Sequence, residues 1–188
     1  TDIAISSLSG RQRFPSVAFD GANYFVVWQD YRNGSWDIYG ARVTASGILL
    51  DPSGIAIDTY VNNQQSPAVA FNSDNYMVAW EDYRNGTTSD IYGTRVNRSG
   101  VVVDTVSFSV SLAVNSQQYP AVAFDGTNCL VTWQDKRSGN YDIYGARITR
   151  SGAVLDPSGI AINTRKLDQL APSTAFCGIA YMIVWKHT

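Results

Sequence analysis

The residues best suited to chemistry form a charged constellation that occurs three times in the sequence. Each copy holds an aspartate, an arginine two residues later, and a second aspartate shortly after the arginine. Two carboxylates held together could act as an acid and a base or bind a metal ion, whereas an arginine between them can form salt bridges instead. An active site needs one copy, so three copies favour structural clips, with no catalytic residue, metal site or cofactor. The members are Asp30, Arg32 and Asp37; Asp82, Arg84 and Asp90; and Asp135, Arg137 and Asp142.

The spacing of the constellation indicates a hairpin. A turn signal, Asn33-Gly34 in the first copy, lies between the two aspartates. A two-residue turn there would place Asp30 opposite Asp37 on neighbouring antiparallel strands. Facing carboxylates repel each other, and Arg32 lies on the same strand face as Asp30. We therefore expect each arginine to bridge both aspartates of its own copy.

Aromatic residues near these turns form a second group of candidates. Trp36 lies at a hairpin tip where the third copy has Tyr141, and Tyr31 and Tyr83 directly follow the first aspartate of their copies. Such rings at one rim could form a platform on which the apolar face of a sugar stacks. The same pattern is also compatible with ordinary packing between adjacent hairpins. Trp36, Tyr31, Tyr83 and Tyr141 are thus the predicted ligand-binding residues.

Two other residues were considered for catalysis. His187 is the only histidine and lies one residue from the end of the sequence, which argues against a Ser-His-Asp triad. Glu81 is the only glutamate, and the equivalent residues in other copies are Gln29, Gln134 and Lys186. A lone glutamate does not supply the carboxylate pair that glycoside hydrolysis normally needs, although an aspartate could provide the second.

The constellations belong to a repeat that extends through the sequence. Four prolines recur 52 or 53 residues apart, at Pro15, Pro67, Pro120 and Pro172. Each repeat holds four strand-like stretches separated by turn signals, and none shows helical periodicity. Four antiparallel strands with both faces apolar predict the blade of an all-β propeller. We place the units at 15–66, 67–119 and 120–171, with a split unit formed by 172–188 and 1–14, in one domain over 1–188.

The split unit would lack one strand. Ile3-Ala-Ile5 aligns with the fourth strand of other units, and the sequence ends after a second strand. The stretch from Tyr181 to Trp185 would then keep an apolar, unpaired edge, and such edges recruit partners. A four-bladed ring could close imperfectly, other copies could complete the unit, or the segment could belong to a longer array. We expect self-association, as a homodimer or a ring of several chains.

The composition limits the possible partners. The 188 residues are 45% hydrophobic and 16% charged, with a formal net charge of −2. The sequence has no basic patch, which argues against a nucleic-acid partner, and the longest apolar run is too short to span a membrane. Cys129 and Cys177 lie beside the same turn in successive copies, so either two free thiols or a disulfide is possible.

One motif resembles a known family. The pattern Trp-x-Asp-x-Arg-x-Gly-x-x-Asp-Ile-Tyr, preceded by Pro-x-Val-Ala-Phe-Asp-Gly and Tyr-x-Val-x-Trp, is similar to the WD40-like propeller repeats of TolB type. It is especially similar to the arrays in bacterial and archaeal surface proteins. The resemblance covers nearly the whole chain and implies a propeller in an extracytoplasmic setting, whether secreted, periplasmic or on the cell surface. The motif is specific for fold and poorly specific for function.

The sequence thus predicts a non-catalytic binding or surface-display module that recognises a glycan or a protein through the loops at the blade rim. The alternative is a fragment of a propeller hydrolase or lyase whose active site lies partly outside this chain. A copy-specific acidic cluster in a deep central pocket would favour the enzyme. An exposed aromatic rim without such a cluster would favour the binding module.

Overall fold

The computed structural model describes residues 2–188, which form fourteen β-strands in four antiparallel sheets. The first three sheets each hold four strands, hydrogen-bonded in chain order, so the predicted all-β propeller architecture is confirmed.

The first blade contains β1 (Gln12–Phe19), β2 (Asn23–Asp30), β3 (Asp37–Thr44) and β4 (Ile55–Asp58). The second contains β5 (Gln64–Phe71), β6 (Asn75–Asp82), β7 (Asp90–Asn97) and β8 (Phe108–Ser111). The third contains β9 (Gln117–Phe124), β10 (Asn128–Asp135), β11 (Asp142–Thr149) and β12 (Ile160–Asn163), and the last sheet contains β13 (Gln169–Phe176) and β14 (Tyr181–His187). No helix that could span a membrane occurs within 2–188.

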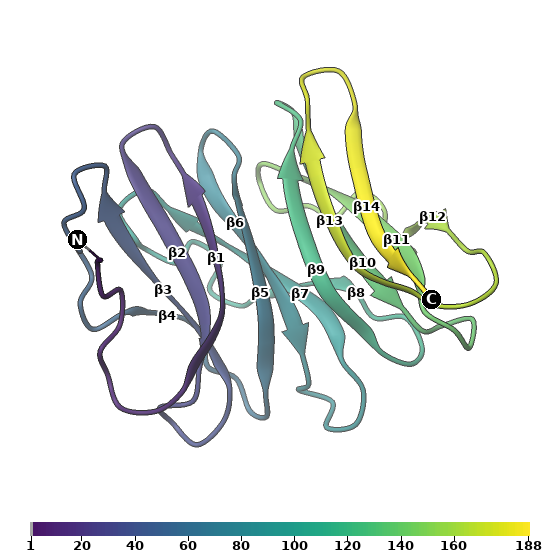
Figure 1. Cartoon of the computed structure of the whole chain (residues 1–188), viewed down its shortest axis with the longest axis horizontal. Helices are drawn as coiled ribbons and strands as arrows, with labels where there is room; N and C mark the ends of the chain where they lie inside the picture. The colour runs from purple at the N-terminus through teal and green to yellow at the C-terminus, as the bar shows by residue number, and fades with distance from the viewer. Residues whose placement is uncertain (1) are drawn as a thin grey trace.

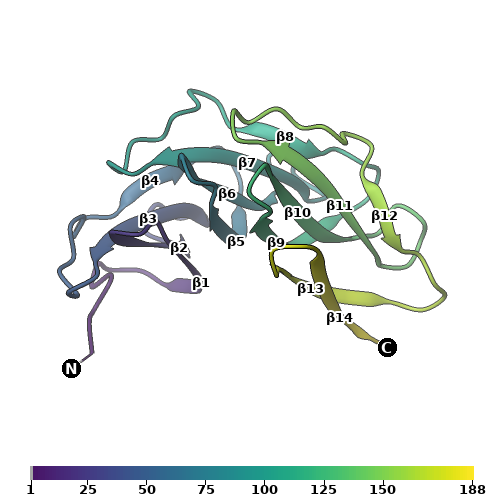
Figure 2. The ribbon, with the colours of Figure 1, turned by 90° about the horizontal axis from the view of Figure 1, so that it is seen from above.

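The blades stand side by side around an axis lined by their first strands. The inner strands β1, β5, β9 and β13 contact one another in sequence, and they can be followed from one blade to the next in Figure 1. Seen from above, the four sheets form an open arc, and the two ends of the chain lie on opposite sides of its opening (Figure 2). The strands β4, β8 and β12 lie on the outside of this arc.

The first residues do not pair with the last sheet. Within 2–188 that sheet holds β13 and β14 alone, so the expected joining of 172–188 with 1–14 into one sheet is not observed. The N-terminal segment instead packs on the first blade, where a side chain at Gly47 would collide with Ile3. The repeat-equivalent Ile55 lies in the same way against Gly100 of the second blade. The segment therefore occupies the place that the outer strand of a preceding blade would take.

Every inner strand carries a bulge at its repeat proline. The residue before the proline has a positive φ of 50–52°, although it is never glycine. This conformation costs a non-glycine residue roughly 1–2 kcal/mol. The sequence pattern of alternating large and small residues gave no sign of it. The four bulge residues are Phe14, Ser66, Tyr119 and Ala171.

A hydrogen bond between blades holds three of these bulges in place. The backbone N–H of Ser66 donates to Gln29 Oε1 of the preceding blade at 2.9 Å. Tyr119 donates to Glu81, and Ala171 to Gln134, at the same distance. Each acceptor side chain is buried directly after the repeat tryptophan. We call this contact the interblade clamp, because it fixes the strained bulge of one blade against the blade before it.

Apolar cores fill the spaces between blades. One core joins the first and second blades and includes Trp80, and the other joins the second and third and includes Trp133. In both cores the tryptophan of the later blade packs against the earlier blade. Trp28 of the first blade, which has no blade before it here, packs with Ile5 of the N-terminal segment instead. Trp28, Trp80 and Trp133 are core residues, as the pattern predicted, whereas the fourth repeat tryptophan, Trp185, is only half-buried at the end of the arc.

The interblade clamp generates a prediction about pH and stability. Glu81 is the only charged acceptor in the clamp, and burial raises the pKa of its carboxyl, although hydrogen bonds from Tyr119, Ser66 and Tyr83 oppose the shift. The folded protein then holds this proton more tightly than the unfolded chain, so ionisation of Glu81 destabilises the fold as pH rises through the folded pKa. Glu81→Gln keeps the acceptor without the charge. We expect it to raise the free energy of unfolding at pH 7 by roughly 1 kcal/mol, and the gain to vanish near pH 4.

Urea unfolding across this pH range measures the effect. Gln134→Glu is the matched control, because it places the same charge in the third blade and should lower stability at pH 7. A Glu81→Gln variant that is less stable than the parent at neutral pH, or a difference that does not change with pH, would contradict this account of the clamp.

Candidate functional site

The charged constellations lie at one end of each blade, where the second strand turns into the third. Asp30 and Asp37 are register partners on β2 and β3, as are the aspartates of the other two copies, so the expected facing of the carboxylates is present. The loop between them has six residues in the first blade rather than two. Both carboxylates are buried.

The first aspartate of each copy is saturated with hydrogen bonds. In the second blade, Asp82 accepts from Trp80 Nε1 at 3.0 Å, from the backbone N–H of Arg84 at 2.8 Å, and from two guanidinium nitrogens at 2.9 and 2.6 Å. The guanidinium carbon lies 3.7 Å from the ring centroid of Tyr92. The third blade repeats this arrangement, and in the first blade Arg32 reaches Asp30 at 2.5 Å. We call the Trp–Asp–Arg–Tyr group the tip cluster.

The prediction that each arginine also bridges to the second aspartate of its copy is wrong. Asp37 accepts from Asn33 and Ser35, and Asp90 from Asn85. The physical reason is the hydrogen bond from the backbone N–H of Arg32 to the Asp30 carboxylate. This bond folds the arginine side chain back toward its own strand and over the ring of Tyr39. Burial, followed by repulsion from Asp82, raises the pKa of Asp90 to about 6, although Asn85 works against the shift.

The first aspartate of each copy is not arranged for catalysis. The first aspartates have no exposed surface, and their oxygens already accept from a tryptophan and an arginine. A general acid or base must reach the proton that it transfers, and a nucleophile must reach the substrate carbon. The tip clusters therefore serve the fold.

The predicted aromatic residues fall into two groups at the same end of the blades. Tyr31 and Trp36 of the first blade lie with their ring centroids 5.1 Å apart, and the guanidinium of Arg13 lies 5.6 Å from the Trp36 ring centroid. Tyr31 is exposed and Trp36 is half-buried. The hydroxyls of Tyr83 and Tyr141 both bond to one amide, that of Gln118, at 3.2 and 2.9 Å. The first group forms an open platform, whereas the second bridges two blades.

The tyrosines of the second group are partly withdrawn from water. Burial raises the pKa of Tyr83, and the nearby Glu81 adds to the shift. Burial likewise raises the pKa of Tyr141. Both phenols therefore stay protonated at neutral pH and can donate hydrogen bonds.

A shallow axial depression of about 210 Å³ lies where the four bulges converge. Each bulge residue and the proline after it contribute to the wall. Phe14 and Tyr119 expose their rings there, whereas the other two blades present Ser66 and Ala171. Sequence reasoning missed these residues. The available signal was variation, because the position before an invariant proline holds four different residues in four repeats.

No carboxylate lines the axial depression within 2–188. The carboxylate of Glu81 contacts the wall of the depression from behind, because it accepts a hydrogen bond from the backbone N–H of Tyr119, but the Glu81 side chain is buried. Cys129 is buried and Cys177 is exposed, and both are free thiols. The depression and its rim can hold a ligand through aromatic rings and neutral hydrogen-bonding groups.

Comparison with known proteins places the fold among propellers. No protein-family model and no curated protein sequence matches the chain. Among solved structures, the endo-arabinase from Bacteroides thetaiotaomicron superposes on 98% of this chain and 74% of its own, with a TM-score of 0.66 and 14% identity. A thermostable family-43 glycoside hydrolase superposes on 93% of this chain and 65% of its own, with a TM-score of 0.64 and 12% identity.

A third similar structure is more distant. A neuraminidase-like protein of A/little yellow-shouldered bat/Guatemala is covered over 48% of its length, with a TM-score of 0.57 and 14% identity, so the chain spans about half of that protein. Identities this low show the fold alone. The chain is a β-propeller of the kind found in glycoside hydrolases and neuraminidase-like proteins. The propeller implied by the sequence motif is supported, whereas a TolB-type or WD40-like repeat family is not shown.

The tip cluster generates a prediction about stability. Asp82→Ala leaves the guanidinium of Arg84 and the indole N–H of Trp80 buried without their acceptor, and such a loss costs about 3–5 kcal/mol. Asp74→Asn is the control, because the Asp74–Arg150 pair is 3.7 Å long with both side chains well exposed, and it should cost roughly 0–1 kcal/mol. Urea unfolding of both variants measures the difference. Equal losses in the two variants would refute a structural role for the cluster.

Proposed function

We propose that this chain is the carbohydrate-contacting part of a propeller glycoside hydrolase whose active site lies partly outside the chain. The observation that supports this most is the axial depression, together with the Tyr31–Trp36 platform, which is linked to it by Arg13, the residue before Phe14. The likeness in fold to glycoside hydrolases points in the same direction. Polysaccharides lie outside the cytoplasm, so the proposal includes an extracytoplasmic location.

The proposed binding mode follows from the side chains present. The Tyr31 and Trp36 rings offer apolar faces to the C–H groups of a sugar ring, and Arg13 lies beside them as a hydrogen-bond donor. Phe14 and Tyr119 would contact a neighbouring sugar of the same chain in the depression. Hydrolysis would need two carboxylates about 5–9.5 Å apart on either side of the glycosidic bond. This chain by itself is therefore expected to bind glycans without cleaving them.

Binding by isothermal calorimetry to arabinan, mannan and sialylated oligosaccharides tests the proposal. Trp36→Ala should weaken binding roughly tenfold, the loss of one stacking contact. Tyr24→Ala is the matched control, because Tyr24 is an exposed aromatic residue at the opposite end of β2, and its loss should have no effect. Absence of binding across the panel, or equal effects of both variants, would exclude a carbohydrate-contacting role for this rim.

A non-catalytic module that binds a glycan or a protein through the rim loops is the second candidate. The burial and saturation of the repeat aspartates favour it. The two candidates differ in the longer polypeptide: glycan cleavage by a protein that contains this segment would support the hydrolase, and tight binding without cleavage would support the module.

We also propose that the chain associates with itself head to tail. Val17 and Val184 are 59% and 55% exposed at the two ends of the arc. Their repeat equivalents Val69 and Val27 are buried together in the core between the first two blades. Docking of the Val184 face of one copy on the Val17 face of another would recreate that core.

Light scattering at micromolar concentration tests this self-association. The parent chain should exceed its monomer mass of 20.6 kDa. Val17→Lys and Val184→Lys should each be monomeric alone, because each loses one face. An equimolar mixture should form a one-to-one complex through the two intact faces. A monomeric parent, or variants that still associate alone, would contradict the head-to-tail arrangement.

A further inference from the structure

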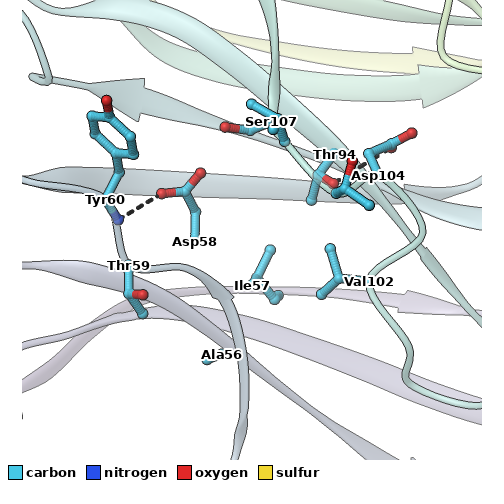
Figure 3. Close-up of a pocket in the computed structure, with 11 residues that line it drawn as sticks. Ala56, Ile57, Asp58, Thr59, Tyr60, Thr94, Val102, Asp104 and Ser107 are labelled. Atoms are coloured by element: carbon cyan, nitrogen blue, oxygen red, sulfur yellow. Dashed lines mark hydrogen bonds between the residues drawn. The ribbon is translucent and has the colours of Figure 1, made fainter.

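A second hollow lies far from the axial depression, on the outside of the arc between the first two blades. Its volume is about 490 Å³, within the usual range for small-molecule sites. One wall is the end of β4 and the residues after it, 56–60, and the other is formed by Thr94 of β7 with Val102 and residues 104–107 before β8. Figure 3 shows side chains from both walls around one space. We call this hollow the outer pocket.

Both walls depart from the repeat. Asp58-Thr59-Tyr60 stands where the next unit has Ser111-Leu112-Ala113. Thr105-Val106-Ser107 stands where the first and third units have Pro-Ser-Gly. These two changes lie about one unit apart in the sequence and meet only in the folded chain. Blade packing does not need them, because the neighbouring units pack without them.

The change to Thr105-Val106-Ser107 alters the hydrogen-bond partners of Arg84 in the second tip cluster. In the first and third blades the arginine donates to the carbonyl of the serine in Pro-Ser-Gly, at 2.7 and 2.6 Å. In the second blade Arg84 donates instead to Ser107 Oγ at 3.0 Å and approaches Asp58 Oδ2 at 3.5 Å. The outer pocket is thus joined to the second tip cluster.

Asp58 keeps unused acceptor capacity. One oxygen accepts from the backbone N–H of Tyr60 at 2.9 Å (Figure 3), and the other has a long contact with Arg84 at 3.5 Å and the hydroxyl of Ser107 beside it. The guanidinium of Arg84 is engaged at 2.6 Å by Asp82 and neutralises that carboxylate first. Burial, with repulsion from Asp82, raises the pKa of Asp58, although Ser107 and the Tyr60 N–H oppose the shift. Hydroxyl groups of a ligand would satisfy this carboxylate.

Tyr60 supplies an exposed ring held in a fixed place. Its centroid lies 4.5 Å from the guanidinium carbon of Arg84, which lies 3.7 Å from the ring centroid of Tyr92. Contact with the guanidinium restrains the ring, yet the residue is 54% exposed. An exposed, restrained aromatic ring next to a carboxylate and several hydroxyls is suited to a sugar, whose C–H face is apolar and whose edge carries hydroxyls.

We propose that the outer pocket is an accessory binding site for one neutral sugar residue. The Tyr60 ring stacks on the C–H face of the sugar, and the remaining lone pairs of the Asp58 carboxylate accept from its hydroxyls. Ser107 offers a further hydroxyl partner. The charge of the walls favours a neutral sugar, because within 2–188 Asp58 has no close cation of its own, whereas Arg84 is paired with Asp82 and Asp104 is paired with Arg95. This site is independent of the proposed glycan contact at the axial depression.

Saturation-transfer NMR and titration with methyl β-D-mannopyranoside, methyl β-D-glucopyranoside and methyl β-D-glucuronide test the site. At least one neutral glycoside should bind, and the charged glucuronide should bind more weakly. Tyr60→Ala and Asp58→Asn place in the first unit the residues that the second and third units carry at these positions, Ala113 and Asn163, so the fold should tolerate both. Each should weaken binding roughly tenfold or more.

Two controls keep this test separate from the proposed function. Leu112→Ala changes an exposed residue in the equivalent loop of the second unit, and Trp36→Ala removes the platform at the axial rim; neither should alter binding of the glycoside. Loss of binding in Trp36→Ala alone would place the sugar at the axial rim and overturn the outer site. Failure of both neutral glycosides to bind at millimolar concentration, unchanged binding in Tyr60→Ala and Asp58→Asn, or preference for the glucuronide would also overturn it.

Discussion

The structure depends on a carboxylate buried at the tip of each blade. Asp82 and its two equivalents have no exposed surface, which is costly for a charge unless donors surround it. The indole N–H of the repeat tryptophan, a backbone N–H and the arginine provide those donors. The same tryptophan fills the core between blades, so one hydrogen-bonded group ties hairpin shape to blade stacking. Its repetition in the three complete blades explains why the most conspicuous charged residues of the sequence are buried in the fold.

Stacking of the blades adds a second constraint. Each inner strand bends through a bulge with a strained residue before its proline, and the clamp residue of the preceding blade accepts the N–H that the bulge exposes. Three of the four bulges are held by this clamp, whereas the bulge at Phe14 has the same positive φ with no blade before it in the described chain. At the open sides of the arc, the faces of β1 and β14 show the apolar residues that are buried elsewhere in the repeat.

The proposed binding surfaces lie at positions where the repeats differ. The axial depression is lined by the variable residue before each proline, and the outer pocket by segments in which one unit departs from its neighbours. A repeat protein preserves the residues that every blade needs for packing, and it can change the others without losing its fold. Copy-specific aromatic and carboxyl groups, such as Tyr60 and Asp58, are therefore more informative about ligands than the charged motif that recurs.

The sequence by itself determined the propeller, the strand order within each blade, the facing of Asp30 and Asp37, and the core position of the repeat tryptophans in the three complete blades. These follow from a period of 52 or 53 residues and from spacings of a few residues, which turn geometry converts directly into contacts. Tertiary structure decided the partners of Asp37, the positive φ of Phe14 and its equivalents, the clamp at Glu81, and the packing of Ile3 on the first blade. It also decided the joining of Asp58 with Ser107 in one pocket. Most of these depend on contacts between residues of different blades or on a choice among several nearby donors, and a local pattern carries no information about either.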